Sequence, residues 1–162
     1  MICQLEQIAK LLVQRDWSLV TAESCTGGGL SRQVTSVPGS SVWFDRGFVT
    51  YSNAAKQELL DVPENMIEEY GAVSEEVVVA MARGALAHSR AQLAVAVTGI
   101  AGPDGGSEEK PVGTVWFAWV IETKTSSRCR LFEGDREAIR RQSEEYAIEG
   151  MLELLNATAI QT

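Results

Sequence analysis

The 162-residue sequence predicts an α/β fold, a three-layer α/β/α domain whose mixed sheet combines parallel strands with a late antiparallel hairpin. Two observations support this prediction. Strand-length apolar segments alternate with helical patterns along most of the chain, as in domains whose helices cover both faces of a sheet. Near the end, two strand patterns follow each other directly, as in a hairpin. We expect one domain over residues 1–162, because the chain has the length of a single core and contains no linker or repeat.

Helical and strand patterns alternate through the first half of the chain. Apolar residues recur at helical spacing near the N-terminus, and the segment PGSS ends a later helical pattern. The alternation of Phe48, Val49 and Tyr51 predicts a strand, and Asn53 is expected to cap the helix that follows. The expected elements are a helix over about residues 4–15, a strand over 17–23, a helix over 30–37, a strand over 46–52 and a helix over 54–60.

The second half adds a long helix, a central strand and a hairpin. Ser74 is expected to cap a helix to about His88, because the acidic residues that follow it complement the positive end of the helix dipole. The apolar run at residues 92–98 predicts a strand covered on both faces. Two antiparallel strands joined near the segment KTSS precede a closing helix capped by Asp135. The expected order of elements is αβαβααβββα.

Composition limits the classes of function. A formal net charge of -8 with scattered lysines and arginines opposes binding to nucleic acid. The apolar runs are too short to cross a bilayer and the first residues lack a secretion signal, so we expect no membrane partner and a cytoplasmic location. Three widely spaced cysteines, Cys3, Cys25 and Cys129, indicate neither a disulfide framework nor a zinc site.

Residues 21–33, TAESCTGGGLSRQ, place a serine, a cysteine and a threonine directly before three glycines. The lysine of a P-loop is missing, the glycine spacing differs from that of a dinucleotide-binding fingerprint, and the G-x-S-x-G elbow of hydrolases is absent. A strand-to-helix turn capped by Ser24 or Thr26 accounts for the pattern. Glycines that open a helix also leave backbone N–H groups free for an anion or a developing oxyanion, so a binding or catalytic role stays open.

A nucleophilic serine needs a base, and a lysine is the best-placed candidate. His88, the only histidine, falls at the end of a predicted helix, where a Ser-His-Asp triad fits poorly. Lys56 lies in the first turn of the helix after Asn53, where the helix dipole lowers the pKa of a lysine. Tyr51 lies five residues before it. Taken alone, Lys56 also fits an exposed helix position, and Tyr51 a core position in a strand.

Other polar residues suggest further roles. Cys25 competes with Ser24 as a nucleophile, although a free cysteine beside a strand also fits a small buried apolar side chain. Acidic residues near the loops lack a metal-ligating spacing and are expected to be solvated or to cap helices: Glu23, Asp45, Asp104, Glu108 and Glu109. Four arginines are candidate partners of an anion, although each equally fits a surface pair with a glutamate: Arg46, Arg136, Arg140 and Arg141.

Six segments, in order, resemble motifs of the CinA C-terminal domain family: TAESCTGG, GFVTYSNAAK, GAVSEEVV, TGIAGPDGG, KPVGTVWFA and GDREAIRRQ. They cover nearly the whole chain, and within the family the sequence is most similar to free-standing nicotinamide-nucleotide amidases. The resemblance implies an α/β fold and hydrolysis of the carboxamide of nicotinamide mononucleotide to nicotinate mononucleotide and ammonia, in pyridine nucleotide (NAD) recycling. A catalytically silent nucleotide-binding paralogue, or an amidase for another small carboxamide, is the alternative.

The resemblance implies a serine nucleophile assisted by a lysine and a tyrosine, and the matching positions are Ser24, Lys56 and Tyr51. In the implied mechanism, neutral Lys56 accepts the Ser24 proton, Tyr51 orients or relays it, and Ser24 forms an acyl-enzyme that water resolves. Backbone N–H groups of the segment CTGG or of the segment GIAG would bind the oxyanion, and the sequence does not choose between them. Such a mechanism needs no metal and no organic cofactor.

The nucleotide itself is the expected partner, as a small-molecule substrate. We expect Arg46 and Arg140 to face its phosphate. The expected substrate-binding residues are Thr26, Gly27, Arg46, Gly99, Ala101, Gly102 and Arg140. We also expect the chain to form a homo-oligomer.

Overall fold

Five strands form one sheet in the order β2-β1-β3-β4-β5 in the computed structural model, which describes residues 1–158. The strands are β1 (Leu19–Glu23), β2 (Phe44–Val49), β3 (Leu93–Gly99), β4 (Thr114–Ile121) and β5 (Lys124–Leu131). Strand β1 pairs in parallel with β2 and β3, whereas β4 is antiparallel to both β3 and β5. The predicted mixed sheet with a late hairpin is therefore confirmed.

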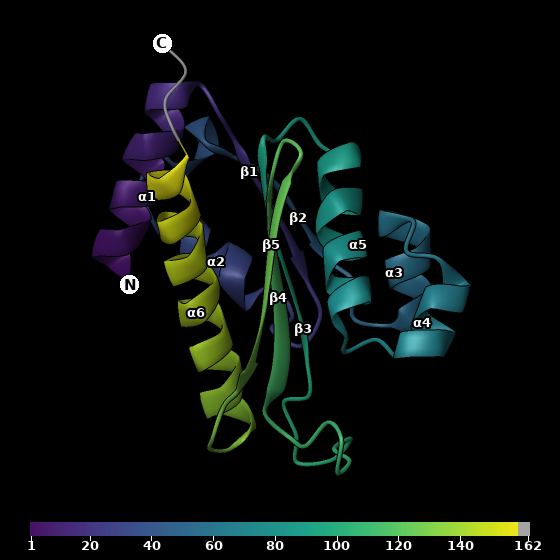
Figure 1. Ribbon diagram of the computed structural model, residues 1–162. Coiled ribbons are helices and arrows are strands. Elements are labelled where there is room, and N and C mark those ends of the chain that lie inside the picture. The colour runs from purple at the N-terminus through teal and green to yellow at the C-terminus, as the bar shows by residue number, and fades with distance from the viewer. Residues whose placement is uncertain (159–162) are drawn as a thin grey trace.

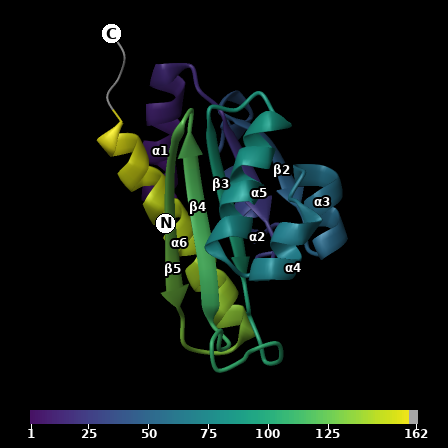
Figure 2. The same ribbon diagram turned by 45° about the vertical axis from the view of Figure 1, so that its right-hand side comes forward.

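Helices cover both faces of this sheet, so the predicted α/β/α layering is also confirmed. One face carries α1 (Ile2–Arg15), α2 (Gly29–Thr35) and α6 (Arg136–Ala157), and the other carries α3 (Asn53–Leu60), α4 (Glu64–Tyr70) and α5 (Glu75–Ala87) (Figure 1). A short 3-10 turn, Ser40–Val42, precedes β2. Figure 2 shows the loop between β3 and β4 projecting beyond the lower end of the sheet.

The alternation of side chains along the strands explains how both faces are filled. On β3, Val95 and Val97 pack into the core under α1 and α6, while Ala94 and Ala96 face the core under α5. All four are fully buried, as expected for a central strand. Within the described residues, no helix combines the length and apolarity needed to span a membrane.

Packing against β4 fixes the position of α6, which carries three of the four candidate arginines. The Trp119 indole lies against Gly150, where an added Cβ would lie 2.1 Å from the Trp119 ring atom Cζ2. The indole N–H also donates a hydrogen bond of 2.9 Å to the carbonyl of Ala147. A side chain at position 150 would push the helix outward, so the glycine sets the close approach of α6 to the sheet.

Three local expectations were wrong. Helix α4 was missed, because it is short and buries only Ile67. Ser52, rather than Asn53, caps α3, and its hydroxyl accepts a hydrogen bond from the backbone N–H of Ala55. The hairpin turns at residues 122–123, and the segment KTSS belongs to β5. The caps expected at Ser74 and Asp135 are confirmed, since each side chain accepts a backbone N–H of its helix.

Candidate active site

Ser24 stands at the end of the sheet where the parallel strands β1, β2 and β3 have their carboxyl ends. It directly follows β1, and its backbone N–H donates to the carbonyl of Val97 at 3.0 Å, which extends the pairing with β3 by one residue. Its side chain is almost buried, with 8% of the residue exposed. Crevices outside the carboxyl ends of such strands are the usual ligand sites of α/β domains.

The Lys56 ammonium group lies beside the Ser24 hydroxyl. Lys56 is in the first turn of α3 and is 1% exposed. Its Nζ lies 3.0 Å from Ser24 Oγ, 2.9 Å from the carbonyl oxygen of Thr50 and 3.3 Å from that of Tyr51. A neutral amine that donates its two hydrogens to these two carbonyls directs its lone pair at the Ser24 hydroxyl. The lysine is therefore held in the geometry of a general base.

Burial lowers the pKa of Lys56 from 10.5 to about 8. The main cause is the loss of water around the charged amine, which disfavours the ammonium form. The helix dipole, which the sequence suggested as the cause, is not required. A lysine with this pKa is partly neutral near neutral pH, as a base must be.

Glu23 organises the loop that carries Ser24. Its carboxylate is fully buried and accepts hydrogen bonds from the Thr26 hydroxyl at 2.7 Å and from the backbone N–H of Leu30 at 2.7 Å. Its other oxygen accepts from the Ser31 N–H at 3.0 Å and from the Ser31 hydroxyl at 2.7 Å. Glu23 thus takes the capping role expected of Ser24 or Thr26, which leaves the Ser24 hydroxyl free for Lys56.

Ser24 and Lys56 open into a cavity of about 290 Å³. The predicted residues Gly99, Ala101 and Gly102 line it, together with Cys25. The backbone N–H groups of Cys25 and Ala101 donate no hydrogen bond to another residue in the described part of the chain, although that of Cys25 faces its own thiol. Each of the two segments expected to bind an oxyanion therefore contributes a free donor to the cavity wall.

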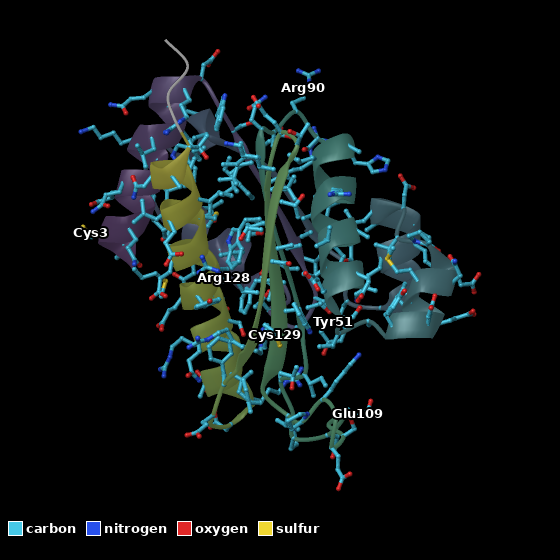
Figure 3. The ribbon with its side chains drawn as sticks, in the orientation of Figure 1. Cys3, Tyr51, Arg90, Glu109, Arg128 and Cys129 are labelled. Atoms are coloured by element: carbon cyan, nitrogen blue, oxygen red, sulfur yellow. The ribbon has the colours of Figure 1, made fainter. Side chains whose placement is uncertain are left out.

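Tyr51 and Arg136 form the mouth of the same cavity. The Tyr51 hydroxyl accepts a hydrogen bond of 3.0 Å from Arg136 Nη2, and Arg136 Nη1 donates to the carbonyl of Gly102 at 2.7 Å. Tyr51 is 59% exposed and lies near the lower end of the sheet in Figure 3. Its backbone carbonyl, rather than its phenol, meets Lys56, so the predicted proton relay through the phenol has no hydrogen bond that supports it.

Four predicted substrate-binding residues lie outside this cavity. Arg46 donates to the Asp45 carboxylate at 2.9 Å and to the carbonyl of His88, at the far end of the sheet. Thr26 is fully buried and faces Glu23. Gly27 and Arg140 line a second cavity instead.

The surroundings of Cys25 differ from those of Ser24. The Cys25 thiol is 6% exposed, and its sulfur would lie 3.1 Å from a Cβ added at Gly99. Burial raises the pKa of Cys25 to about 12. The thiol therefore stays protonated and packs as a small apolar group, which argues against Cys25 as a nucleophile.

Comparison with known proteins identifies the family of this chain. A family model described as the CinA C-terminal domain matches residues 4–155. The chain belongs to the CinA C-terminal domain family. A nicotinamide-nucleotide amidohydrolase PncC from Pseudomonas putida is 59% identical over 136 residues, which cover 84% of this chain and 85% of that protein. The PncC of Escherichia coli strain K12 is 54% identical over 147 residues, which cover 89% and 88%.

Solved structures agree with the fold of this CinA domain. A crystal structure of a competence-damaged protein (CinA) superfamily protein from Klebsiella pneumoniae is similar with a TM-score of 0.93 and 36% sequence identity. The match covers 97% of this chain and 98% of that chain.

Two residues of the CinA domain site were underestimated from the sequence. Glu23 was expected to be solvated or capping, and it caps from a fully buried position. The signal was a single carboxylate at the end of an apolar strand, which must be hydrogen-bonded if that strand is central. Arg136 was one of four candidate arginines, and only the packing of α6 distinguishes it. Within residues 1–158, no group of three or more His, Cys, Asp or Glu side chains could hold a metal ion.

Proposed function

We propose that this chain hydrolyses the carboxamide of nicotinamide mononucleotide to nicotinate mononucleotide and ammonia. Relatives of nearly the same length, at 54–59% identity, are named nicotinamide-nucleotide amidohydrolases, and the chain itself is a hydrolase of amide bonds. The observation that carries the mechanism is the 3.0 Å contact between a buried Lys56 amine and the Ser24 hydroxyl. We assign the reaction to NAD recycling in the cytoplasm.

The proposed mechanism has two halves. Neutral Lys56 accepts the proton of Ser24 as the Ser24 oxygen attacks the carboxamide carbon. The N–H groups of Cys25 and Ala101 stabilise the oxyanion, and the Lys56 ammonium returns its proton to the leaving ammonia. Neutral Lys56 then deprotonates a water molecule, which attacks the acyl-enzyme. As the bond to Ser24 breaks, Lys56 returns this proton to the Ser24 oxygen, and the released acid ionises to the carboxylate product. The carbonyls of Thr50 and Tyr51 keep the amine oriented through both halves.

We assign recognition of the substrate phosphate to Arg136 instead of Arg46 and Arg140. Arg136 lines the cavity that holds Ser24, whereas the other two do not. A guanidinium matches a phosphate in geometry and charge, and Arg136 is already oriented by Gly102 and Tyr51. Gly99, Ala101 and Gly102 keep their proposed contact with the nucleotide, since a small cavity wall permits close approach of the backbone.

Ammonia release from nicotinamide mononucleotide tests the proposal. Ser24→Ala and Lys56→Ala should each reduce the rate at least about a thousandfold, because each removes one partner of the covalent step. Ser36→Ala and Lys10→Ala alter residues outside the site and should keep wild-type activity. Full activity in Ser24→Ala would contradict the nucleophile assignment. Binding without ammonia release in the wild type would identify a silent paralogue, and equal hydrolysis of nicotinamide riboside would identify an amidase that ignores the phosphate.

The chain is also proposed to self-associate through the edge of the sheet. Strand β2 is an edge strand, and the exposed apolar residues Val42 and Val49 lie just before it and at its end, with 71% and 48% exposure. Apolar side chains beside an unpaired strand edge favour contact with another chain. Sedimentation at several protein concentrations would detect the association, and Val49→Lys should weaken it.

A further inference from the structure

A second cavity, of about 470 Å³, lies between α2 and α6 and borders the glycine loop. Its wall contains the glycines at positions 27–29, together with Arg32 from α2 and Arg140 and Arg141 from α6. It shares no lining residue with the cavity that holds Ser24. A ligand bound there would not occupy the proposed substrate site.

The three arginines of this cavity have no carboxylate partner within salt-bridge distance among residues 1–158. Arg32 and Arg140 act on Glu144 only at longer range, where their charges oppose the rise of its pKa. The Nε atom of Arg140 is buried without a hydrogen-bond partner, and only its Nη2 is engaged, by the carbonyl of Thr26 at 3.2 Å. Guanidinium groups that line one cavity without a carboxylate partner indicate a site for an anion.

Two glutamates, Glu137 and Glu144, also line the cavity and reduce its positive charge. Burial raises the pKa of Glu144, and the amide of Gln33 donates to its carboxylate at 3.2 Å. Glu144 is therefore easier to neutralise than an exposed glutamate, and an approaching anion would favour its protonation. The three guanidinium groups outnumber the carboxylates even when both are charged.

We propose that this cavity binds a phosphoryl dianion, either inorganic phosphate or a phosphate monoester, at a site separate from the substrate site. Arg140 connects the two, because the guanidinium that faces the anion also holds the carbonyl of Thr26, two residues after Ser24. An anion bound at Arg140 therefore acts on the loop that carries the nucleophile. The ligand is an effector and not the substrate.

Backbone amide signals in an NMR titration with inorganic phosphate, at constant ionic strength, test this site. The amides at positions 27–29 report on the second cavity, and those of Gly102 and Gly105 report on the cavity of Ser24. We expect the first set to shift saturably, with its own dissociation constant. Repeating the titration with glycerol phosphate shows which form binds better, and tighter binding identifies the natural source.

Matched variants separate specific binding from general attraction. Arg32 and Arg141 are exposed, so replacing them should leave the fold intact. Arg32→Gln and Arg141→Gln should each weaken the shifts at positions 27–29 about tenfold. Arg90→Gln, at the opposite end of the sheet in Figure 3, should not. The proposal is overturned if the amides at 27–29 do not shift, if they shift equally in all variants, or if Arg136→Gln abolishes their shift.

Discussion

The pH dependence of the reaction follows directly from the burial of Lys56. In the proposed mechanism the lysine must be neutral to accept the Ser24 proton, and its pKa is lowered to about 8. About one molecule in a hundred then carries a neutral Lys56 at pH 6, about one in eleven at pH 7, about half at pH 8 and about nine in ten at pH 9. The value of kcat/KM should therefore rise about tenfold per pH unit below about pH 7 and level off above about pH 9.

Ammonia release at low substrate concentration gives this profile, because kcat/KM reports the ionisation of the free enzyme. Lys56→Arg is the matched variant, since a guanidinium stays protonated across the range and cannot act as a base. It should be inactive at every pH, with no rising limb. A wild-type rate that is flat or falls between about pH 6 and 9 would refute Lys56 as the base. An unchanged rising limb in Lys56→Arg would assign the titration to another group.

Three further predictions test the same site. Glu23→Gln should lower kcat and destabilise the fold by about 3 kcal/mol, because one amide cannot accept four hydrogen bonds. Ammonia release measures kcat, and urea denaturation measures the stability. An unchanged kcat would contradict the role of Glu23 in positioning the Ser24 loop. Arg136→Gln should raise KM for nicotinamide mononucleotide about tenfold and leave the riboside unaffected, and an equal change for both substrates would remove the phosphate assignment. Because the pKa of Lys56 is lowered in the folded protein, the unfolded chain binds more protons between about pH 8 and 10.5. The stability of the wild type should therefore rise through that window by up to about 3 kcal/mol relative to Lys56→Met. Denaturation midpoints that stay parallel for the two proteins would contradict this.

Periodicity and loop chemistry predicted most of the fold. The helices α1, α5 and α6 each bury a stripe of apolar residues, and β3 is apolar on both faces, so their patterns are visible in sequence. Helix α4 has seven residues and a single buried position, Ile67, which is too little for a periodic pattern. Ser52 and Asn53 are both good caps, and only the position where α3 begins distinguishes them.

The site was less predictable than the fold, because contacts between distant segments decide it. Ser24 and Lys56 are separated by 32 positions, and the burial that lowers the lysine pKa depends on how α3 packs against the sheet. The sequence alone does not show which of Arg46 and Arg136 reaches the cavity. Strand β2 carries Arg46 to the far end of the sheet, whereas α6 begins beside the loop that follows β3, which brings Arg136 to the cavity.

The separation of two buried ionisable groups makes the lysine usable as a base. Glu23 and Lys56 flank Ser24, and a direct ion pair between them would keep the lysine charged and unable to accept a proton. Glu23 instead accepts four hydrogen bonds, from the start of α2 and from Thr26, and has no part in the pKa shift of Lys56. Lys56 in turn meets only neutral oxygens, so burial is the largest influence on its pKa. Replacing the donors of Glu23 would therefore affect the base as well as the loop: in Ser31→Ala the carboxylate loses one donor, and the rising limb of kcat/KM should move to higher pH.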